Sequence, residues 1–400
     1  MANKLYEESS VQAIADAIRA KNGSADTYTI GQMATAVTNL TSGGVRTCRV
    51  VVGTSTAEWT EADCDYLCDG TNDEVEIQAA IDEVEAAGGG HVVILNGTYN
   101  CVIKQENSRF APPISVSGNV DIAGNSLGTL IYFSTKEGEY ISGADDVRAI
   151  TVDPSGGNFH LSNLTIQFSD PSSARYASVF AAVGVLNGSG PTETSFVVEG
   201  VRFIGWQSGV WTYGNRRTVI SGCQFENSAG RGIEILGSGV TVNNCTFDCI
   251  KGILLYATGN VFGCTFWITE GSIGIEAKLT GTDNSAIISG NTFACKNLPS
   301  DLSETSMWGT GIYVGSSSSL VIDGNIFDFM EIAKYNSSVQ SEDDKVFYAT
   351  IEYYQNKRFA AYTSFICNNL FIAEGVYIDD PETQAKNLVQ ANNQVSQYFA

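Results

Sequence analysis

The stretch ISGCQF at 220–225 is followed by VNNCTF at 242–247 and VFGCTF at 261–266, and this six-residue phrase decides the fold. Further copies are VEGVRF (198–203), ISGNTF (288–293), IDGNIF (322–327) and ICNNLF (366–371). The terminal phenylalanines are separated by 22, 22, 19, 27, 34 and 44 residues. A second phrase, Gly followed by a β-branched residue, begins at Gly209, Gly232, Gly252, Gly274, Gly311 and Gly375. A period near 22 residues with two or three short strands predicts a solenoid.

The strand chemistry identifies the kind of solenoid. Apolar and polar residues alternate within each unit, as in Cys245, Thr246, Phe247 and Asp248, and Gly or Asn stands where the chain must turn. No unit contains the helix-periodic residues of a helical repeat. The sequence therefore predicts a parallel β-helix, an all-β fold in which each strand pairs with its equivalent one coil away.

Two residues before each phenylalanine, one position forms a column on the same strand face. It reads Val201, Cys223, Cys245, Cys264, Asn291, Asn325 and Asn369. We expect a buried thiol stack and a ladder of hydrogen-bonded asparagines, although adjacent coils would also bring two sulfurs within disulfide reach. A metal site or catalytic thiol is the weaker alternative, because the only histidines are His91 and His160.

Composition limits the function classes. The chain has 400 residues, 43 % of them hydrophobic, with 41 glycines and a formal net charge of −22. The negative charge argues against nucleic acid and anionic membranes as partners. No apolar run of 18 residues predicts a membrane span, and the first residues have no signal-peptide pattern. No cofactor or metal motif is strong enough to assign.

Residues 1–40 differ from the rest. Val11, Ile14 and Ile18 have helical spacing, and Thr29 with Gln32 predicts a capping box for a second helix. Two such helices bury too little surface to be stable alone, so we expect a partner chain or self-association. Residues 41–44 predict a flexible linker, which leaves 45–400 for the β-helix.

The segment before the first coil predicts a lid. Thr71 and Glu74 predict a capping box for a helix over 73–87, and Ile77, Ile81 and Val84 form its apolar stripe. Such a helix would cover the open end of the solenoid. The acidic spacing at 69–73 lacks the glycine and terminal glutamate of a calcium-binding EF-hand loop, so a turn is the better interpretation.

Two segments resemble known families. IADAIRAKNGSADTYTIGQMATAV (14–37) resembles an N-terminal helical module of phage and prophage tail proteins, which implies attachment to a tail or baseplate through residues 1–40. Asp69, Gly70, Asp73, the glycines at 88–90 and Gly97 to Tyr99 are similar to the opening of the pectate-lyase-like superfamily of right-handed β-helices. That superfamily includes polysaccharide lyases, glycosidases and phage tailspikes, so this likeness concerns the fold and not one activity.

The uneven spacing of the later phrases predicts loop excursions at 296–310 and 330–362, where binding surfaces are common. VQANNQV (389–395) is the expected last coil. We expect its open end to be covered by the 330–362 loop or by neighbouring subunits.

Two columns expected to face outward carry the candidate site. The residue after each phenylalanine gives Glu226, Asp248 and Trp267, and the residue after Gly-Ile gives Trp211, Glu234, Glu276 and Tyr313. Aromatic faces and carboxylates suit sugars, whereas the alternative is an ordinary solvated acidic face. Glu226 and Asp248 should lie one coil apart, and Glu234 and Glu276 two coils apart with Leu254 between them, near the retaining and inverting separations of glycosidases. Crowding should raise carboxylate pKa values, as a general acid requires.

Arg231 and Lys251 should lie one coil apart and would neutralise a uronate, and Trp308 in the first excursion is a further glycan-binding candidate. A lyase motif cannot be matched, so a glycoside hydrolase is the preferred enzyme class. The resemblance implies a homotrimeric tailspike on a virion tail that recognises bacterial surface polysaccharide, with cleavage as a candidate activity. A free polysaccharide lyase or hydrolase, and a structural tail or adhesin component, are the alternatives.

Overall fold

The computed structural model describes residues 11–12, 14–16, 48–106, 109–110, 112–135, 146–153, 157–169, 179–185, 194–213, 217–226, 230–279, 284–295, 307–316, 319–330, 347–353, 364–372, 376–378 and 388–396. The chain divides into two compact units, Met1–Cys48 and Arg49–Ala400. Within the first unit, residues 11–12 and 14–16 are helical, and Ile14 is exposed while Ala15 is buried. The predicted second helix and the 41–44 linker lie outside the described residues.

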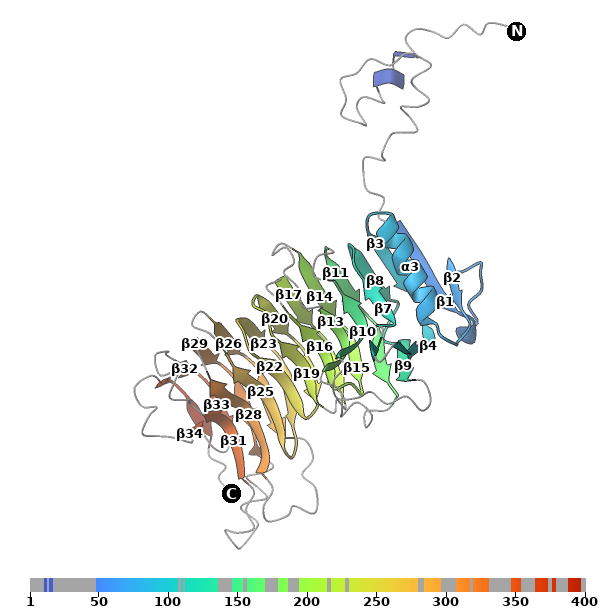
Figure 1. Ribbon diagram of the computed structural model, residues 1–400. Helices are drawn as coiled ribbons and strands as arrows, with labels where there is room; N and C mark the ends of the chain where they lie inside the picture. Colours follow the sequence, from blue (N-terminus) through green and yellow to red (C-terminus); the bar gives the residue numbers. More distant parts are fainter. Residues whose placement is uncertain are drawn as a thin grey trace, which may run out of the picture. The chain divides into compact units, whose positions relative to one another are not determined.

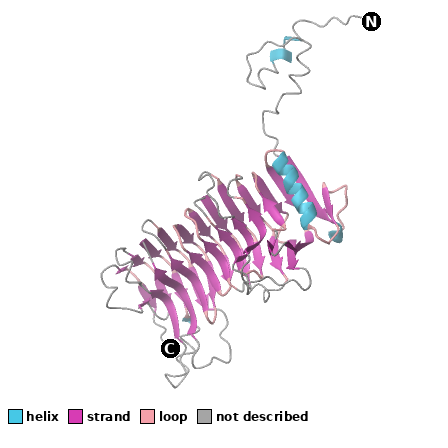
Figure 2. Cartoon of the chain, in the orientation of Figure 1, coloured by secondary structure: helices cyan, strands magenta, loops and turns pink. Residues whose placement is uncertain are grey.

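The second unit is a parallel β-helix whose strands form three long sheets (Figure 1). In each coil the chain passes through sheet 1, sheet 2 and sheet 3 in turn. Each strand of a coil pairs in parallel with its equivalent in the next coil, for example Phe225 with Phe247 and Ile233 with Ile253. The predicted parallel β-helix is therefore confirmed (Figure 2).

Sheet 1 has 13 strands, which are, in spatial order, β2 (Tyr66–Cys68), β1 (Cys48–Thr54), β3 (Gly90–Ile94), β8 (Val120–Gly124), β11 (Phe159–Ser162), β14 (Ser195–Glu199), β17 (Arg217–Ser221), β20 (Val240–Asn243), β23 (Gly259–Phe262), β26 (Ser285–Ser289), β29 (Ser319–Asp323), β32 (Ser364–Cys367) and β35 (Leu388–Ala391). Sheet 2 has 11 strands, which are β4 (Gly97–Ile103), β9 (Thr129–Thr135), β12 (Thr165–Phe168), β15 (Arg202–Ile204), β18 (Gln224–Glu226), β21 (Thr246–Asp248), β24 (Thr265–Ile268), β27 (Thr292–Cys295), β30 (Ile326–Asp328), β33 (Leu370–Ile372) and β36 (Gln394–Ser396).

Sheet 3 has 10 strands, which are β7 (Ile114–Val116), β10 (Asp146–Val152), β13 (Val179–Val185), β16 (Ser208–Thr212), β19 (Arg231–Ile235), β22 (Lys251–Leu255), β25 (Ser272–Lys278), β28 (Met307–Ser316), β31 (Phe347–Tyr353) and β34 (Val376–Ile378). A small antiparallel pair joins β5 (Gln105–Glu106) and β6 (Arg109–Phe110), and η1 (Ser55–Ala57) is a short 3-10 helix after β1. β31 lies inside the predicted 330–362 excursion, so that excursion contains a core strand of sheet 3.

The corner between sheets 1 and 2 is the most regular part of the coil. From β11 onward it is two residues long, and the first of them has a positive φ, as in Gly222 (61°) and Asn244 (52°). Glycine and asparagine tolerate this left-handed conformation at low cost, which explains why they recur in the six-residue phrase. The second corner residue points inward, and it is the column that contains the cysteines and asparagines.

The phenylalanine column forms a continuous stack in the core. Neighbouring rings from Phe203 to Phe371 lie 4.7–5.0 Å apart between centroids, with interplanar angles of 2–12°. The glycines of the second phrase make room for these rings, because a Cβ built on Gly252 would lie 2.7 Å from the Phe266 ring and 2.4 Å from the Gly274 carbonyl oxygen. The two sequence phrases are therefore one packing unit.

The inward corner column is a thiol stack followed by an asparagine ladder, as predicted. Cys223, Cys245 and Cys264 are buried free thiols. Hydrogen bonding with the neighbouring thiols, together with burial, raises the pKa of Cys245, so it stays protonated and unsuited to nucleophilic catalysis. Asn325 is fully buried, and its Oδ1 accepts hydrogen bonds from N and Nδ2 of Asn291, both at 3.0 Å.

Helix α3 (Glu74–Ala86) covers the first coil, where it packs against β2, β3, β4, β7 and β8. Ile77, Ile81 and Val84 are buried, as the apolar stripe predicts. The predicted capping box is wrong, because the Glu74 carboxylate instead accepts from the backbone N–H of Val102 (3.0 Å) and pairs with Lys104 (2.8 Å). The Glu74 side chain therefore binds the helix to β4 and does not cap the helix N-terminus.

Candidate functional site

The candidate site lies on the outer side of sheet 3. Trp211, Glu234, Leu254, Glu276 and Tyr313 are successive Cα partners on β16, β19, β22, β25 and β28. We call this column, together with the flanking cations Arg148, Arg231, Lys251 and Lys278, the sheet 3 strip. The predicted spacing is confirmed, since Glu234 and Glu276 are two coils apart with Leu254 between them.

The strip is far less exposed than the sequence predicts. The exposed fraction is 6 % for Trp211, 0 % for Leu254 and 3 % for Glu276. The expectation of a solvent-facing column is therefore wrong at these positions. Burial strengthens the electrostatic interactions of the strip, because fewer waters screen them.

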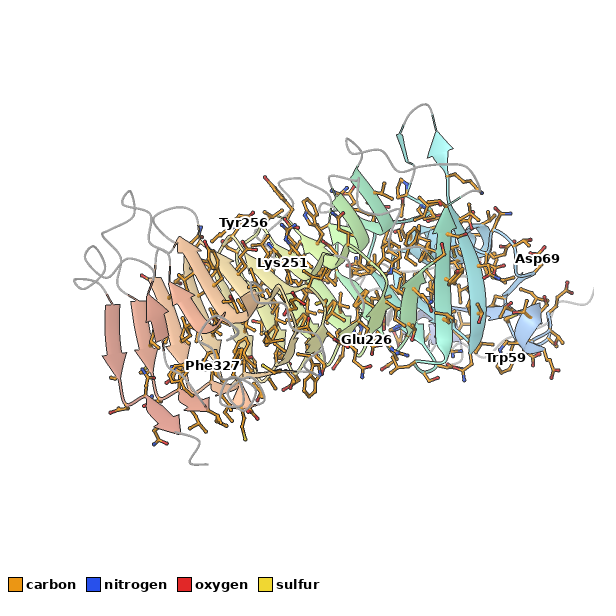
Figure 3. The ribbon with its side chains drawn as sticks, turned by 90° about the horizontal axis from the view of Figure 1, so that it is seen from below. Trp59, Asp69, Glu226, Lys251, Tyr256 and Phe327 are labelled. Carbon is orange, nitrogen blue, oxygen red and sulfur yellow. The ribbon has the colours of Figure 1, made fainter. Side chains whose placement is uncertain are left out.

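Basic side chains neutralise both acids. Arg231 Nη1 lies 3.0 Å from Glu234 Oε2, and Lys251 Nζ lies 3.0 Å from Glu276 Oε2. Lys278 pairs with the other oxygen of Glu276. Arg231 and Lys251 are Cα partners one coil apart, as predicted. Lys251 is labelled in Figure 3.

These cations decide the protonation of Glu276. Burial acts to raise the pKa of Glu276, but hydrogen bonds and charge from Lys278 and Lys251 outweigh it and lower the pKa. The prediction that crowded carboxylates raise one another's pKa is therefore wrong here, because two ammonium groups contact the carboxylate. Glu276 is ionised at neutral pH, so its carboxylate can accept hydrogen bonds but has no proton to donate as a general acid.

The N-terminal end of the strip is an arginine stacked on a tryptophan. The Arg148 guanidinium carbon lies 4.5 Å from the centroid of the Trp211 ring, which in turn stacks on Tyr213 at 5.8 Å. Arg148 reaches Trp211 across the intervening coil because that coil has Gly184, whose hypothetical Cβ would lie 2.4 Å from Arg148 Cδ. This cation–π contact fixes the tryptophan ring.

The other predicted acid pair lies on sheet 2. Glu226 and Asp248 are Cα partners on adjacent coils, as predicted. Arg202 donates to Glu226 through Nε (3.1 Å) and Nη2 (2.6 Å), and these hydrogen bonds to the Glu226 carboxylate raise the pKa of Arg202. Trp267 lies on β24 of the same sheet. The four acids and two tryptophans are thus divided between two sheets, and Glu226 and Lys251 are both labelled in Figure 3.

Three basic residues that contact the predicted site residues were not predicted from the sequence, namely Lys278, Arg148 and Arg202. Lys278 follows Glu276 by two residues, a strand spacing that would have placed both on one face. Arg148 and Arg202 precede their partners by 63 and 24 residues, so only the register connects them. The backbone of Trp308 lies in β28, but its side chain is outside the described residues.

Sheet 1 carries both histidines of the chain on its outer side. His91, Asp121 and His160 are Cα partners on β3, β8 and β11. Asp121 Oδ2 lies 2.7 Å from His91 Nδ1, and its Oδ1 lies 3.1 Å from His160 Nδ1. The contact with Asp121 raises the pKa of His160. Sequence spacing could not reveal this cluster, because these residues are 30 and 39 positions apart.

Cys68, Asp73 and Glu76 have potential ligand atoms within 4.8 Å of one another. Both Asp73 oxygens already accept backbone N–H groups, from Gly70 (2.9 Å) and Asn100 (2.7 Å). Burial also raises the pKa of Cys68, which keeps its thiol protonated. The turn interpretation of this segment therefore explains the geometry without an ion.

The fold defines a class. A family model described as "Right handed beta helix region" matches residues 181–343, and the three parallel sheets agree with it. The chain therefore has the fold of a right-handed parallel β-helix. Among the described residues, no helix has the length and apolar content needed to cross a bilayer.

Solved structures share this fold at low sequence identity. A tailspike protein double mutant of E. coli bacteriophage HK620 in complex with pentasaccharide aligns with a TM-score of 0.51 and 14 % identity, over 97 % of this chain and 73 % of the tailspike. Another structure of that tailspike is covered over 63 % of its length. The A-module of an Azotobacter vinelandii mannuronan C-5 epimerase aligns with a TM-score of 0.45 and 13 % identity, over 83 % and 93 % of the two chains. A search of curated proteins gave no match.

Proposed function

We propose that the protein is a tailspike-like receptor-binding protein that binds bacterial surface polysaccharide through the sheet 3 strip. The observation that carries this proposal is the row of partly exposed side chains on the strip: Arg231, Lys251 and Lys278 are 32 %, 32 % and 39 % exposed, and Tyr313 is half-buried. Five coils at about 4.8 Å give a strip of roughly 19 Å, long enough for several sugar residues. The tailspike with the same fold was solved with a pentasaccharide, which supports this class of ligand.

A glycan array of bacterial surface polysaccharides tests the proposal. Replacing Tyr313, the half-buried aromatic residue of the strip, by Ala should weaken binding to any hit by about tenfold or more, because aromatic side chains at the centre of a contact surface dominate most interfaces. Phe262→Ala is the matched control, since this aromatic residue is 41 % exposed on sheet 1, away from the strip. If the two variants lose affinity equally, or if no polysaccharide binds, the strip is not a glycan site.

Cleavage is a second candidate function, favoured by the adjacency of Glu226 and Asp248 on neighbouring coils. Side chains one coil apart are near the separation of about 5 Å found in retaining glycosidases. The single amide variants of Glu226, Asp248, Glu234 and Glu276 should be assayed on any glycan that binds. Loss of about two to four orders of magnitude in one variant, with binding retained, would identify a hydrolase. Normal cleavage by all four would make the acids structural.

The proposed protein assembles as a homotrimer on the virion. Residues 1–40 attach it to a tail or baseplate, and the three copies associate side by side. Exposed apolar side chains near the corner of sheets 1 and 2 support such packing, namely Phe262, Ile287 and Ile326. Light scattering should report a trimer. A monodisperse monomer at micromolar concentration would refute this arrangement.

A further inference from the structure

Helix α3 covers the N-terminal end of the β-helix (Figure 1), and a groove of about 440 Å³ lies beside it. The helix forms one wall between Glu74 and Asp82, and Val102, Lys104 and the Pro112–Pro113 pair form the other. We name this feature the α3 groove. None of its lining residues belongs to the sheet 3 strip. Because binding sites in proteins commonly have volumes of about 300 to 1,000 Å³, the groove is large enough for a ligand of its own.

The walls of the α3 groove are mainly apolar. Five of its nine lining side chains are those of valine, alanine or proline. Val75 is 56 % exposed, the highest fraction among the large apolar side chains that the structure places at the surface. Ala79 lies one turn further along the helix, where its short side chain lets a ligand approach α3 closely. Exposed apolar surface of this kind, edged by polar residues, is typical of an interaction site.

The polar side chains of the groove hold its two walls together. Gln78 Nε2 donates to the carbonyl of Ser115 (3.0 Å), and Gln78 Oε1 accepts from the backbone N–H of Ser115 (2.7 Å). Glu74 joins α3 to Lys104 (2.8 Å) and to the backbone N–H of Val102 (3.0 Å). The groove is therefore formed before a ligand arrives, and the charge of Lys104 is neutralised within it.

The surroundings of the groove are strongly acidic. Between Arg49 and Asn100 the chain has 11 acidic residues, whereas Arg49 is the only arginine or lysine. Asp82 is an exposed residue of the groove wall, and Glu83 beside it is also exposed. A field of this sign concentrates cations and repels acidic ligands. The charge therefore restricts the ligand to a basic one, and the walls require that it also has an apolar part.

We propose that the α3 groove binds a basic segment of a partner protein. The segment inserts an aliphatic side chain against Val75 and Ala79 and places lysine or arginine side chains beside Asp82. The apolar contact supplies most of the affinity, while the charges steer the encounter and fix the orientation. A sugar matches this groove less well, because none of the nine lining residues is aromatic and a sugar ring has no face on which to stack. The interaction is independent of glycan binding at the sheet 3 strip.

Selection from a library of short random peptides, with the full-length protein as the target, tests the proposal. We expect the enriched peptides to combine an aliphatic residue with flanking lysine or arginine. Replacing the aliphatic residue by Ser, or the basic residues by Glu, should lower their affinity by about tenfold or more. Enrichment of acidic or uncharged peptides, or no enrichment, would overturn the proposal. Equal binding by spermine, a cation without an apolar side chain, would overturn it as well.

Variants locate the peptide on the protein. Val75→Ser removes apolar surface and Ala79→Gln fills the groove, and each should weaken the selected peptides by about tenfold or more. Asp82→Asn should weaken them by about threefold and reduce the dependence of binding on salt. Ile250→Ser is the matched control, because Ile250 is 49 % exposed and lies outside the groove. A thermal melt of each variant checks folding. Equal losses in Val75→Ser and Ile250→Ser, or no loss in Ala79→Gln, would show that the peptides bind elsewhere.

Discussion

Replacing Asn325 by Ala should open the core locally and by a predictable amount. The side chain is fully buried, and its Nδ2 donates to the Ile288 carbonyl (2.9 Å) and to Asn369 Oδ1 (3.0 Å). Its Oδ1 accepts two bonds from Asn291. Alanine satisfies none of these groups, so the Asn291 N–H and the Ile288 carbonyl are left buried without their partner.

Each buried group left without a partner costs about 1 to 3 kcal/mol, and partial relaxation reduces the sum. We therefore expect about 2 to 4 kcal/mol of lost local stability, which corresponds to roughly 30- to 1000-fold faster amide exchange. Because neighbouring coils stabilise one another, the effect should be largest at the coils that contain Asn291 and Asn369.

Hydrogen exchange followed by mass spectrometry measures this loss of stability peptide by peptide. The peptide that contains Asn291 N–H should lose protection, while peptides near α3 should not. Asn260→Ala, an exposed asparagine on β23, is the control and should change exchange little. Loss of less than about threefold in protection at Asn291 would refute the reasoning, because it would mean that the ladder contributes no net stability.

Three further variants test other features. Gly252→Ala should lower the unfolding free energy by about 1 to 3 kcal/mol, because its Cβ would lie 2.7 Å from the Phe266 ring. Gly259→Ala, whose Cβ would have no atom nearer than 3.4 Å, should be neutral. Urea titration measures both variants, and equal effects would contradict the packing argument. Glu276→Gln should lower the unfolding free energy by about 3 kcal/mol, because Lys251 and Lys278 would then repel each other beside a nearly buried side chain. Glu270→Gln, at an exposed position, is the control. A cost under about 1 kcal/mol would mean that the lysines relax into solvent. His160→Gln tests the cluster of His91, Asp121 and His160, in which His160 Nε2 also lies 3.8 Å from Glu199 Oε2. Because contact with Asp121 raises the pKa of His160 above 6.5, its stabilising effect is complete below about pH 6.5 and lost as pH rises through the raised value. At the acidic end, burial acts to raise the pKa of Asp121, but His160 and His91 outweigh it, so this contribution persists until pH falls below 3.8. The difference in melting temperature between wild type and His160→Gln should therefore be largest between about pH 4 and 6.5, and a difference independent of pH would refute the ion pair.

Much of the fold was predictable because the residues that repeat in the sequence are those that contact their equivalents in the neighbouring coil. Every copy of the six-residue phrase contains the positive-φ corner, the inward column and the stacked phenylalanine, so one motif predicts three layers of packing. The strand β31 was missed because its sequence breaks the second phrase. Its partner β28 has Gly311 between Thr310 and Ile312, and β31 has Thr350 in the equivalent place, between Ala349 and Ile351.

The candidate site was less predictable, because burial and pairing depend on coils that are distant in sequence. The column of acids and aromatics was found from its spacing, but not the cations that neutralise it. Arg148 contacts Trp211 only because Gly184 in the intervening coil has no side chain. Lys278 lowers the pKa of Glu276 against the effect of burial. Contacts of this kind follow from three-dimensional register and side-chain reach, which spacing alone does not encode.

The two-residue corner between sheets 1 and 2 also bears on how such a protein can diversify. From Ser162 to Ala391 this corner keeps one length through nine successive coils, while the spacing between phenylalanines grows from 19 to 44 residues. The added residues therefore enter at the two other corners, beside sheet 3, and leave the aromatic stack and the ladder unchanged. A lineage could lengthen, shorten or exchange those segments to follow a changing partner while inheriting the same core, coil by coil.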